Sequence, residues 1–174
     1  MKIFLLGIFS ALLAACSFAP TTSAPVEDGK NKGISTVQAN ALGADGLPLA
    51  LTSADSVLSE RSIYFDLDRY EVRDEYRTLL SEHAKFLKQN PQYLMLIQGN
   101  TDERGSSEYN LSLGQKRANA VRRVLNLLGV AETQLEAVSL GKEKPRALGH
   151  DETAWAENRR ADLLYRAPDG RGEF

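Results

Sequence analysis

A carboxylate and a guanidinium are spaced so that both can face one crevice. Asp102 lies in the polar segment 99–105, and Arg117 lies inside the long helical pattern that follows it. Helical side chains lean toward the N-terminus of their helix, so we expect Arg117 to point back toward Asp102. Such a pair suits an amino-acid zwitterion, because the carboxylate takes an ammonium and the arginine fork takes a carboxylate. A structural Asp102–Arg117 ion pair fits the spacing equally well.

Alternating segments place this pair between a strand and a helix. Periodicity and boundary residues predict strands over 63–65, 93–98, 135–140 and 161–165, and helices over 76–87, 107–128 and 152–158. The order β-α-β-α-β-α-β predicts an α/β (α+β) sandwich with the helices on one face of a mixed four-stranded sheet. We expect a domain over 56–167 and a C-terminal tail over 168–174, with Asp162 facing outward from the last strand.

Composition and charge disfavour a nucleic-acid partner. The chain has 174 residues, which fits one globular domain plus sequence that need not fold. Its formal net charge is −2, so it offers no broad cationic surface for a phosphate backbone.

The first sixteen residues predict secretion and lipid attachment. A basic start, an apolar run over 3–13 and two alanines are typical of a signal peptide over 1–15. The run is shorter than the roughly 20 residues of a spanning helix. Residues 13–16 resemble the bacterial lipobox, whose cysteine is acylated, and Cys16 is the only cysteine of the chain. An ordinary signal peptide with an incidental cysteine is the alternative.

Attachment and sorting follow from this motif. Several acyl chains are enough for stable membrane anchoring. Ser17 follows the cysteine where an aspartate would indicate inner-membrane retention, so we expect an outer-membrane anchor and a periplasmic domain. Residues 16–55 are then the lipidated N-terminus and a flexible linker, because 17–52 lack a sustained period. Docking of 47–51 on the domain is the alternative for that short piece.

Residues 62–165 resemble the OmpA-like peptidoglycan-binding domain and, within it, the peptidoglycan-associated lipoprotein (Pal) group. The matching segments follow one another with the spacing of the family: 64–68, 99–105, 109–110, 113–114, 117–118, 141–145, 149–152 and 158–160. Leu67 departs from the phenylalanine common in this group, and Asp162 replaces an apolar residue.

The resemblance implies binding of meso-diaminopimelate in the peptidoglycan stem peptide. Asp102 would receive its ammonium group and Arg117 its carboxylate. The resemblance adds four residues to the pocket: Asp68, Leu67, Thr101 and Asn110.

The resemblance also implies a cellular role. An outer-membrane lipoprotein of this group would tether the membrane to the wall, contact TolB and other Tol proteins, and support envelope integrity and constriction during division. We expect the TolB contact near His83, His150 and Tyr109. If TolB covers the crevice, wall and TolB binding exclude each other.

A peptidoglycan hydrolase that uses Asp68 and Asp102 as an acid–base pair is the alternative function. It would also need an activated nucleophile or a metal-bound water. The sequence shows no serine elbow, His–Cys cluster or calcium-loop pattern. We therefore predict a binding protein with no catalytic residue, metal or cofactor.

Several other polar and aromatic residues are assigned structural roles. His83 is predicted to be packed and hydrogen-bonded, Trp155 to lie in the core, and His150 to lie at the surface. Arg159 and Arg160 fit either anion contacts or a brace for the last strand.

Overall fold

The computed structural model describes residues 42–43 and 46–174. The predicted signal peptide, Cys16 and most of the predicted linker lie outside the described residues. No helix in the part that is described has both the length and the apolar character needed to cross a membrane.

Within the described residues, four strands form one mixed sheet. They are β1 (Ser62–Tyr64), β2 (Leu94–Asn100), β3 (Leu135–Gly141) and β4 (Arg160–Arg166), in the spatial order β1-β4-β2-β3. The central strand β4 is antiparallel to β1 and β2, whereas β2 and β3 are parallel. A parallel pair needs a crossover connection, which the helix α3 provides. The predicted α+β sandwich is confirmed.

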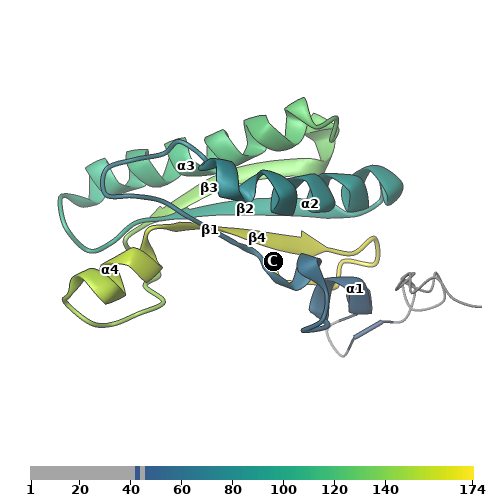
Figure 1. Cartoon of the computed structure of the whole chain (residues 1–174), viewed down its shortest axis with the longest axis horizontal. Coiled ribbons are helices and arrows are strands. Elements are labelled where there is room, and N and C mark those ends of the chain that lie inside the picture. The colour runs from purple at the N-terminus through teal and green to yellow at the C-terminus, as the bar shows by residue number, and fades with distance from the viewer. Residues whose placement is uncertain (1–41, 44–45) are drawn as a thin grey trace, which may run out of the picture. The chain divides into compact units, whose positions relative to one another are not determined.

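Two long helices, α2 (Arg77–Gln89) and α3 (Ser107–Leu127), cover one face of the sheet (Figure 1). The short helix α4 (Glu152–Asn158) lies beyond the strand ends (Figure 1). Its predicted cap is present, because the Asp151 side chain accepts a hydrogen bond from the Ala154 N–H at 2.9 Å. The remaining short elements are α1 (Leu49–Thr52), η1 (Val57–Ser59), η2 (Asp74–Tyr76) and η3 (Glu132–Gln134).

The main core lies between these two helices and the sheet. Alternate residues of the central strands point into it and are fully buried, among them Met95, Ile97, Ala161, Leu163 and Tyr165. Such alternation leaves the intervening residues on the opposite face of the sheet.

His83 is part of this core, as predicted. Its ring is 0% exposed, with Nε2 2.9 Å from the Glu60 carbonyl oxygen and Nδ1 2.9 Å from the Tyr165 hydroxyl. A carbonyl oxygen can only accept, so Nε2 donates to it and Nδ1 accepts from Tyr165. Burial lowers the pKa of His83 to about 4 and keeps the ring neutral at physiological pH.

Segments on both sides of the predicted 56–167 domain pack against it. Leu47 and Leu51 are 0% exposed and belong to the core, so the flexible linker does not extend to residue 55. The docking alternative is confirmed, because burying two leucines outweighs the entropy of a free chain. The C-terminal tail over 168–174 also contacts the domain, since Glu173 N–H donates to the Tyr165 carbonyl at 2.9 Å.

Candidate functional site

Close packing of α3 on β2 determines where Arg117 lies. A Cβ atom on Gly99 would be only 1.9 Å from the carbonyl oxygen of Gly114, so helix and strand approach as closely as two backbones allow. Arg117, about one turn after Gly114, is thereby brought to the end of β2, where the loop carrying Asp102 begins.

The Arg117 guanidinium is surrounded by backbone carbonyl groups. Its Nε donates to Arg69 O at 2.9 Å, its Nη1 to Asn100 O at 2.9 Å and its Nη2 to Asp66 O at 3.2 Å. The side chain is 0% exposed, and burial lowers the pKa of Arg117 to about 10, so the group stays cationic at neutral pH. Of five N–H donors, the three carbonyl contacts use three.

The Asp102 carboxylate pairs with other arginines. Arg104 donates to Oδ1 from its backbone N–H and from Nε, both at 3.1 Å, and to Oδ2 from Nη2 at 2.7 Å. Arg159 Nη1 lies 3.5 Å from Oδ2. Burial raises the pKa of Asp102, but the hydrogen bonds and charge of Arg104 and the charge of Arg159 outweigh it, so the pKa falls below its ordinary value.

Asp102 and Arg117 belong to one electrostatic cluster without forming an ion pair within the described residues. The negative charge of Asp102 raises the pKa of Arg117 against the larger effect of burial. Both side chains are nearly covered, at 5% and 0% exposure. A ligand therefore reaches them only if neighbouring side chains shift, above all Arg104, which occupies three acceptor positions of the carboxylate.

The other predicted pocket residues fall into two groups. Thr101 and Asn110 are buried and hold the loop: Thr101 N–H donates to Gly141 O at 2.9 Å, and Asn110 Nδ2 donates to Arg104 O at 2.7 Å. Leu67 and Asp68 are exposed, and Asp68 has a positive φ of 55°. The Tyr109 hydroxyl donates to the Asp68 carboxylate, which links the start of α3 to the loop after β1.

Sequence reasoning missed the support of the 101–105 loop. The Arg104 guanidinium lies 4.0 Å from the centre of the Trp155 ring, and Trp155 Nε1 donates to Glu103 at 2.9 Å. The prediction that Trp155 lies in the core is wrong, because α4 lies beyond the sheet and its tryptophan is only half-buried. His150, predicted at the surface, has Nδ1 2.9 Å from the same Glu103 carboxylate. The run of three charged residues at 102–104 was the only feature of the sequence that could have indicated that this loop needs partners.

Arg159 serves mainly as a brace. Its Nε donates to Phe65 O at 3.1 Å and its Nη2 to Glu152 at 2.6 Å, so it joins the end of β1 to α4. Its Nη1 is buried with no hydrogen-bond partner among the described residues.

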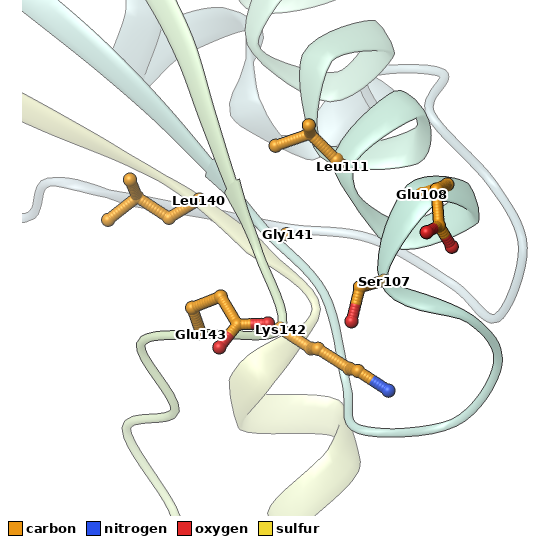
Figure 2. Close-up of a pocket in the computed structure, with 7 residues that line it drawn as sticks. All are labelled: Ser107, Glu108, Leu111, Leu140, Gly141, Lys142 and Glu143. Carbon is orange, nitrogen blue, oxygen red and sulfur yellow. The ribbon is translucent and has the colours of Figure 1, made fainter.

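A separate concavity of about 260 Å³ lies between the first turns of α3 and the end of β3 (Figure 2). Lys142 connects it to the 101–105 loop by donating from Nζ to Gly105 O at 2.8 Å. It contains none of the predicted pocket residues, and its lining is Ser107, Glu108, Leu111, Leu140, Gly141, Lys142 and Glu143. In the described part of the chain, no group of three or more His, Cys, Asp or Glu side chains is arranged to hold a metal ion.

Comparisons with known proteins agree with this architecture. The model of the OmpA family matches residues 64–159. The peptidoglycan-associated lipoprotein of Pseudomonas aeruginosa is 39% identical over 167 residues, which cover 94% of this chain and 99% of the relative. That of Pasteurella multocida is 49% identical over 104 residues, 60% of this chain and 69% of the relative.

Solved structures give the same result. The crystal structure of the peptidoglycan-associated lipoprotein from Burkholderia pseudomallei is 66% identical with a TM-score of 0.66, covering 67% of this chain and 99% of that one. The C-terminal domain of Helicobacter pylori MotB shares the fold alone, at 20% identity and a TM-score of 0.57, covering 61% of this chain and 84% of that chain. The chain therefore belongs to the OmpA family and, within it, to the peptidoglycan-associated lipoproteins.

Proposed function

We propose that this protein is an outer-membrane lipoprotein that binds peptidoglycan non-covalently through the diaminopimelate of the stem peptide. Acyl chains on Cys16 would hold the protein in the membrane, and the folded domain would bind the wall. The relatives are named for association with peptidoglycan, which supports the partner. The charged cluster of Asp102 and Arg117 supports the site.

The observation that carries the proposal is the environment of Arg117. The hydrogen-bond partners of this fully buried guanidinium are neutral carbonyl groups, so no carboxylate contacts its positive charge directly, and such a charge is costly to bury unless an anion meets it. Its two remaining N–H donors can give parallel hydrogen bonds to a ligand carboxylate. Because three carbonyl oxygens already fix the group, little side-chain entropy would be lost on binding.

Asp102 would receive the ligand ammonium. Its lowered pKa keeps the carboxylate ionised, as binding a cation requires. The Arg104 side chain holds two of about four acceptor positions and its backbone N–H holds a third, so the ammonium would have to share or replace the side-chain contacts. The Arg104 side chain is 35% exposed and already contacts the Trp155 ring, so it would keep that partner if it gave up Asp102.

Binding alone accounts for this role, and we propose no turnover. Tethering needs a carboxylate, a guanidinium and an anchor, and no bond in the wall has to be broken.

We further propose that the protein works with TolB and other Tol proteins to maintain the envelope and to follow constriction during division. Of the three residues expected near the TolB contact, His83 is fully buried and cannot touch a partner directly. His150, with a side chain 80% exposed, and Tyr109, 48% exposed, remain candidates. The Tyr109 hydroxyl donates to Asp68, one of the proposed pocket residues, so a TolB molecule seated there would exclude the wall.

Co-sedimentation with purified peptidoglycan tests the wall-binding proposal. The full chain should sediment with the wall, and Asp102→Asn or Arg117→Gln should weaken binding by about 2–5 kcal/mol, because each change leaves one charge of the bound zwitterion without its partner. Arg123→Gln, an exposed change on the same helix, should bind normally. Release of soluble fragments would favour a hydrolase. Unchanged sedimentation of both charge variants would favour a purely structural lipoprotein.

A wall with amidated diaminopimelate provides a second arm. Amidation removes the anionic group that Arg117 would bind, so the unaltered protein should lose affinity for it. The Arg117→Gln variant should then distinguish poorly between the two walls.

A further inference from the structure

The sheet face opposite α2 and α3 carries polar side chains that are buried. Asp162 of β4 is in register with Ser62 of β1 on one side and Gln98 of β2 on the other. These three residues are 7%, 9% and 6% exposed. Asp162 faces away from the core, as the alternation predicted, but is covered rather than open to solvent. Burying polar groups is unfavourable unless all of them find partners.

Asp162 is surrounded by donors. Its carboxylate accepts from Ser62 Oγ at 3.0 Å, from Asn100 Nδ2 at 3.1 Å, from Arg146 Nη2 at 2.7 Å and from Arg160 Nε at 2.9 Å. One carboxylate therefore faces two guanidinium groups, which leaves one positive charge without a counter-charge.

The surrounding residues increase this excess. The side chains around Asp162 include four cations (Arg61, Lys144, Arg146 and Arg160) and two carboxylates (Asp162 and Glu173), so the net formal charge is 4 − 2 = +2. Glu173 does not reduce it further, because it already pairs with Arg61. The excess lies with Lys144, Arg146 and Arg160.

Arg160 also has an unused donor. Its side chain is 5% exposed, and its Nη1 is buried without a hydrogen-bond partner among the described residues. Its Nη2 reaches only Lys144 O, at 3.5 Å. Burial lowers the pKa of Arg160 and the positive charge of Arg146 lowers it further, and together these effects outweigh the opposing effect of the Asp162 carboxylate.

These groups line a cavity of about 600 Å³. That volume is within the roughly 300–1,000 Å³ of small-molecule sites. Besides the six charged residues, its lining consists of Leu51, Thr52, Ser59, Ser62, Gln98 and Leu164. None of the six predicted pocket residues contributes to it, so it is separate from the Asp102 and Arg117 cluster.

We propose that this cavity is a second binding site, for a molecule carrying an oxyanion that Lys144, Arg146 and Arg160 neutralise. An arginine fork and a lysine ammonium group each bind both phosphate and carboxylate oxygens, the fork with two parallel hydrogen bonds and the ammonium as a point charge. Two sources share this chemistry in the envelope: the phosphate of a lipid headgroup and the carboxylate of a wall sugar.

Calorimetric titration of the full chain, purified in detergent at constant ionic strength, tests the proposal. The probes are inorganic phosphate, glycerol 3-phosphate as a headgroup mimic, and N-acetylmuramic acid as a carboxylated sugar. Saturable binding of at least one of them is expected, with no binding of uncharged glycerol or N-acetylglucosamine. Preference for glycerol 3-phosphate identifies the lipid source, and preference for the acidic sugar identifies the wall.

Variants assign the binding to this cavity. Lys144→Gln and Arg146→Gln should each weaken it by roughly tenfold. Lys144 is exposed, so its variant tests the site even if Arg146→Gln unfolds the domain. Lys85→Gln, a matched exposed lysine on α2, should bind as the unaltered protein does. Absence of saturable binding to all three anions overturns the proposal, as does equal weakening by Lys85→Gln and Lys144→Gln.

Discussion

Gly99 of β2 and Gly114 of α3 are in backbone contact, with no room between them for a methyl group. A Cβ atom on Gly99 would lie 1.9 Å from the Gly114 carbonyl oxygen, and one on Gly114 would lie 2.2 Å from Ser139 Oγ. This contact determines how near α3 lies to the sheet. It therefore determines whether Arg117 reaches the carbonyl oxygen of Asn100, 2.9 Å from its Nη1.

Gly99→Ala should separate the helix from the strand. Overpacking in a tight core costs about 1–3 kcal/mol and occasionally more, and here the obstacle is backbone rather than a flexible side chain. Urea unfolding of the full chain should show this loss. Ser112→Ala, an exposed change on α3, should unfold like the unaltered protein. An unchanged free energy of unfolding for Gly99→Ala would mean that the close contact is not required.

Arg117→Lys should lower both stability and wall binding. The lysine keeps the positive charge, but a single ammonium cannot replace a planar fork that donates to Arg69, Asn100 and Asp66 at once. Each lost hydrogen bond to a charged group costs about 1.5–3 kcal/mol, so urea unfolding should reveal a deficit of that size or more. Arg123→Lys is the matched change at an exposed position of α3. Equal stability of the two variants would contradict the structural role of the guanidinium.

Acidification should destabilise the domain through His83. Burial lowers the pKa of this ring from 6.5 to about 4, so the unfolded chain binds the proton at a higher pH than the folded protein does. The contribution of the neutral His83 ring to the free energy of unfolding is therefore complete above pH 6.5 and is lost as the pH falls toward 4. At 1.4 kcal/mol per pKa unit, the loss is about 3 kcal/mol.

Urea unfolding at a series of pH values measures this effect. His83→Gln can keep both hydrogen bonds and should remove this part of the pH dependence. His150→Gln should retain it, because that residue is exposed and its hydrogen bond to Glu103 shifts its pKa upward. Identical pH profiles for His83→Gln and the unaltered protein would exclude His83 as the cause.

Trp155 should report ligand binding. It is the only tryptophan of the chain, and its ring lies 4.0 Å from the Arg104 guanidinium that pairs with Asp102. An ammonium that binds Asp102 must displace or share Arg104, so the emission of Trp155 should change when a stem-peptide fragment is titrated. Asp102→Asn should abolish that change. Binding detected by sedimentation without any change in emission would argue against movement of Arg104.

Cys16→Ser should prevent membrane attachment. The serine cannot take the acyl chains, so the protein should be absent from outer-membrane fractions after alkaline washing, which removes peripherally bound proteins. Immunoblotting of the washed fractions measures this. A Ser17→Ala change next to the modified residue serves as the control and should remain attached. Retention of Cys16→Ser in the washed membranes would refute the anchor.

Local signals predicted most of the elements. The apolar stripe of α3 and the Asp151 cap of α4 are recognisable because they depend on residues within about one turn of each other. Docking of Leu47 and Leu51 was only the alternative to a linker up to residue 55, because residues 17–52 lack a sustained period. Nothing local shows that two leucines find space in a core built by distant residues. Trp155 was misplaced for the same reason, since its residue type favours a core but α4 lies beyond the sheet.

The hydrogen-bond partners of Arg117 could not be predicted from neighbouring residues. Its guanidinium bonds to Arg69 and Asp66, which are 48 and 51 residues away along the chain. Spacing alone predicted that this side chain would lean back toward Asp102, but it could not show that backbone carbonyl groups would enclose it.

The sequence by itself determined the order of strands and helices, the presence of Asp102 and Arg117 on neighbouring segments and the lipobox-like segment at Cys16. Only the tertiary structure decided that Asp102 pairs with Arg104 and Arg159, while Arg117 remains without a carboxylate partner within the described residues. The physical reason is that residue type and local spacing establish which charges are available. Which charged groups come within 4 Å of one another depends on how closely distant elements pack. Here Gly99 and Gly114 set the distance between α3 and the sheet.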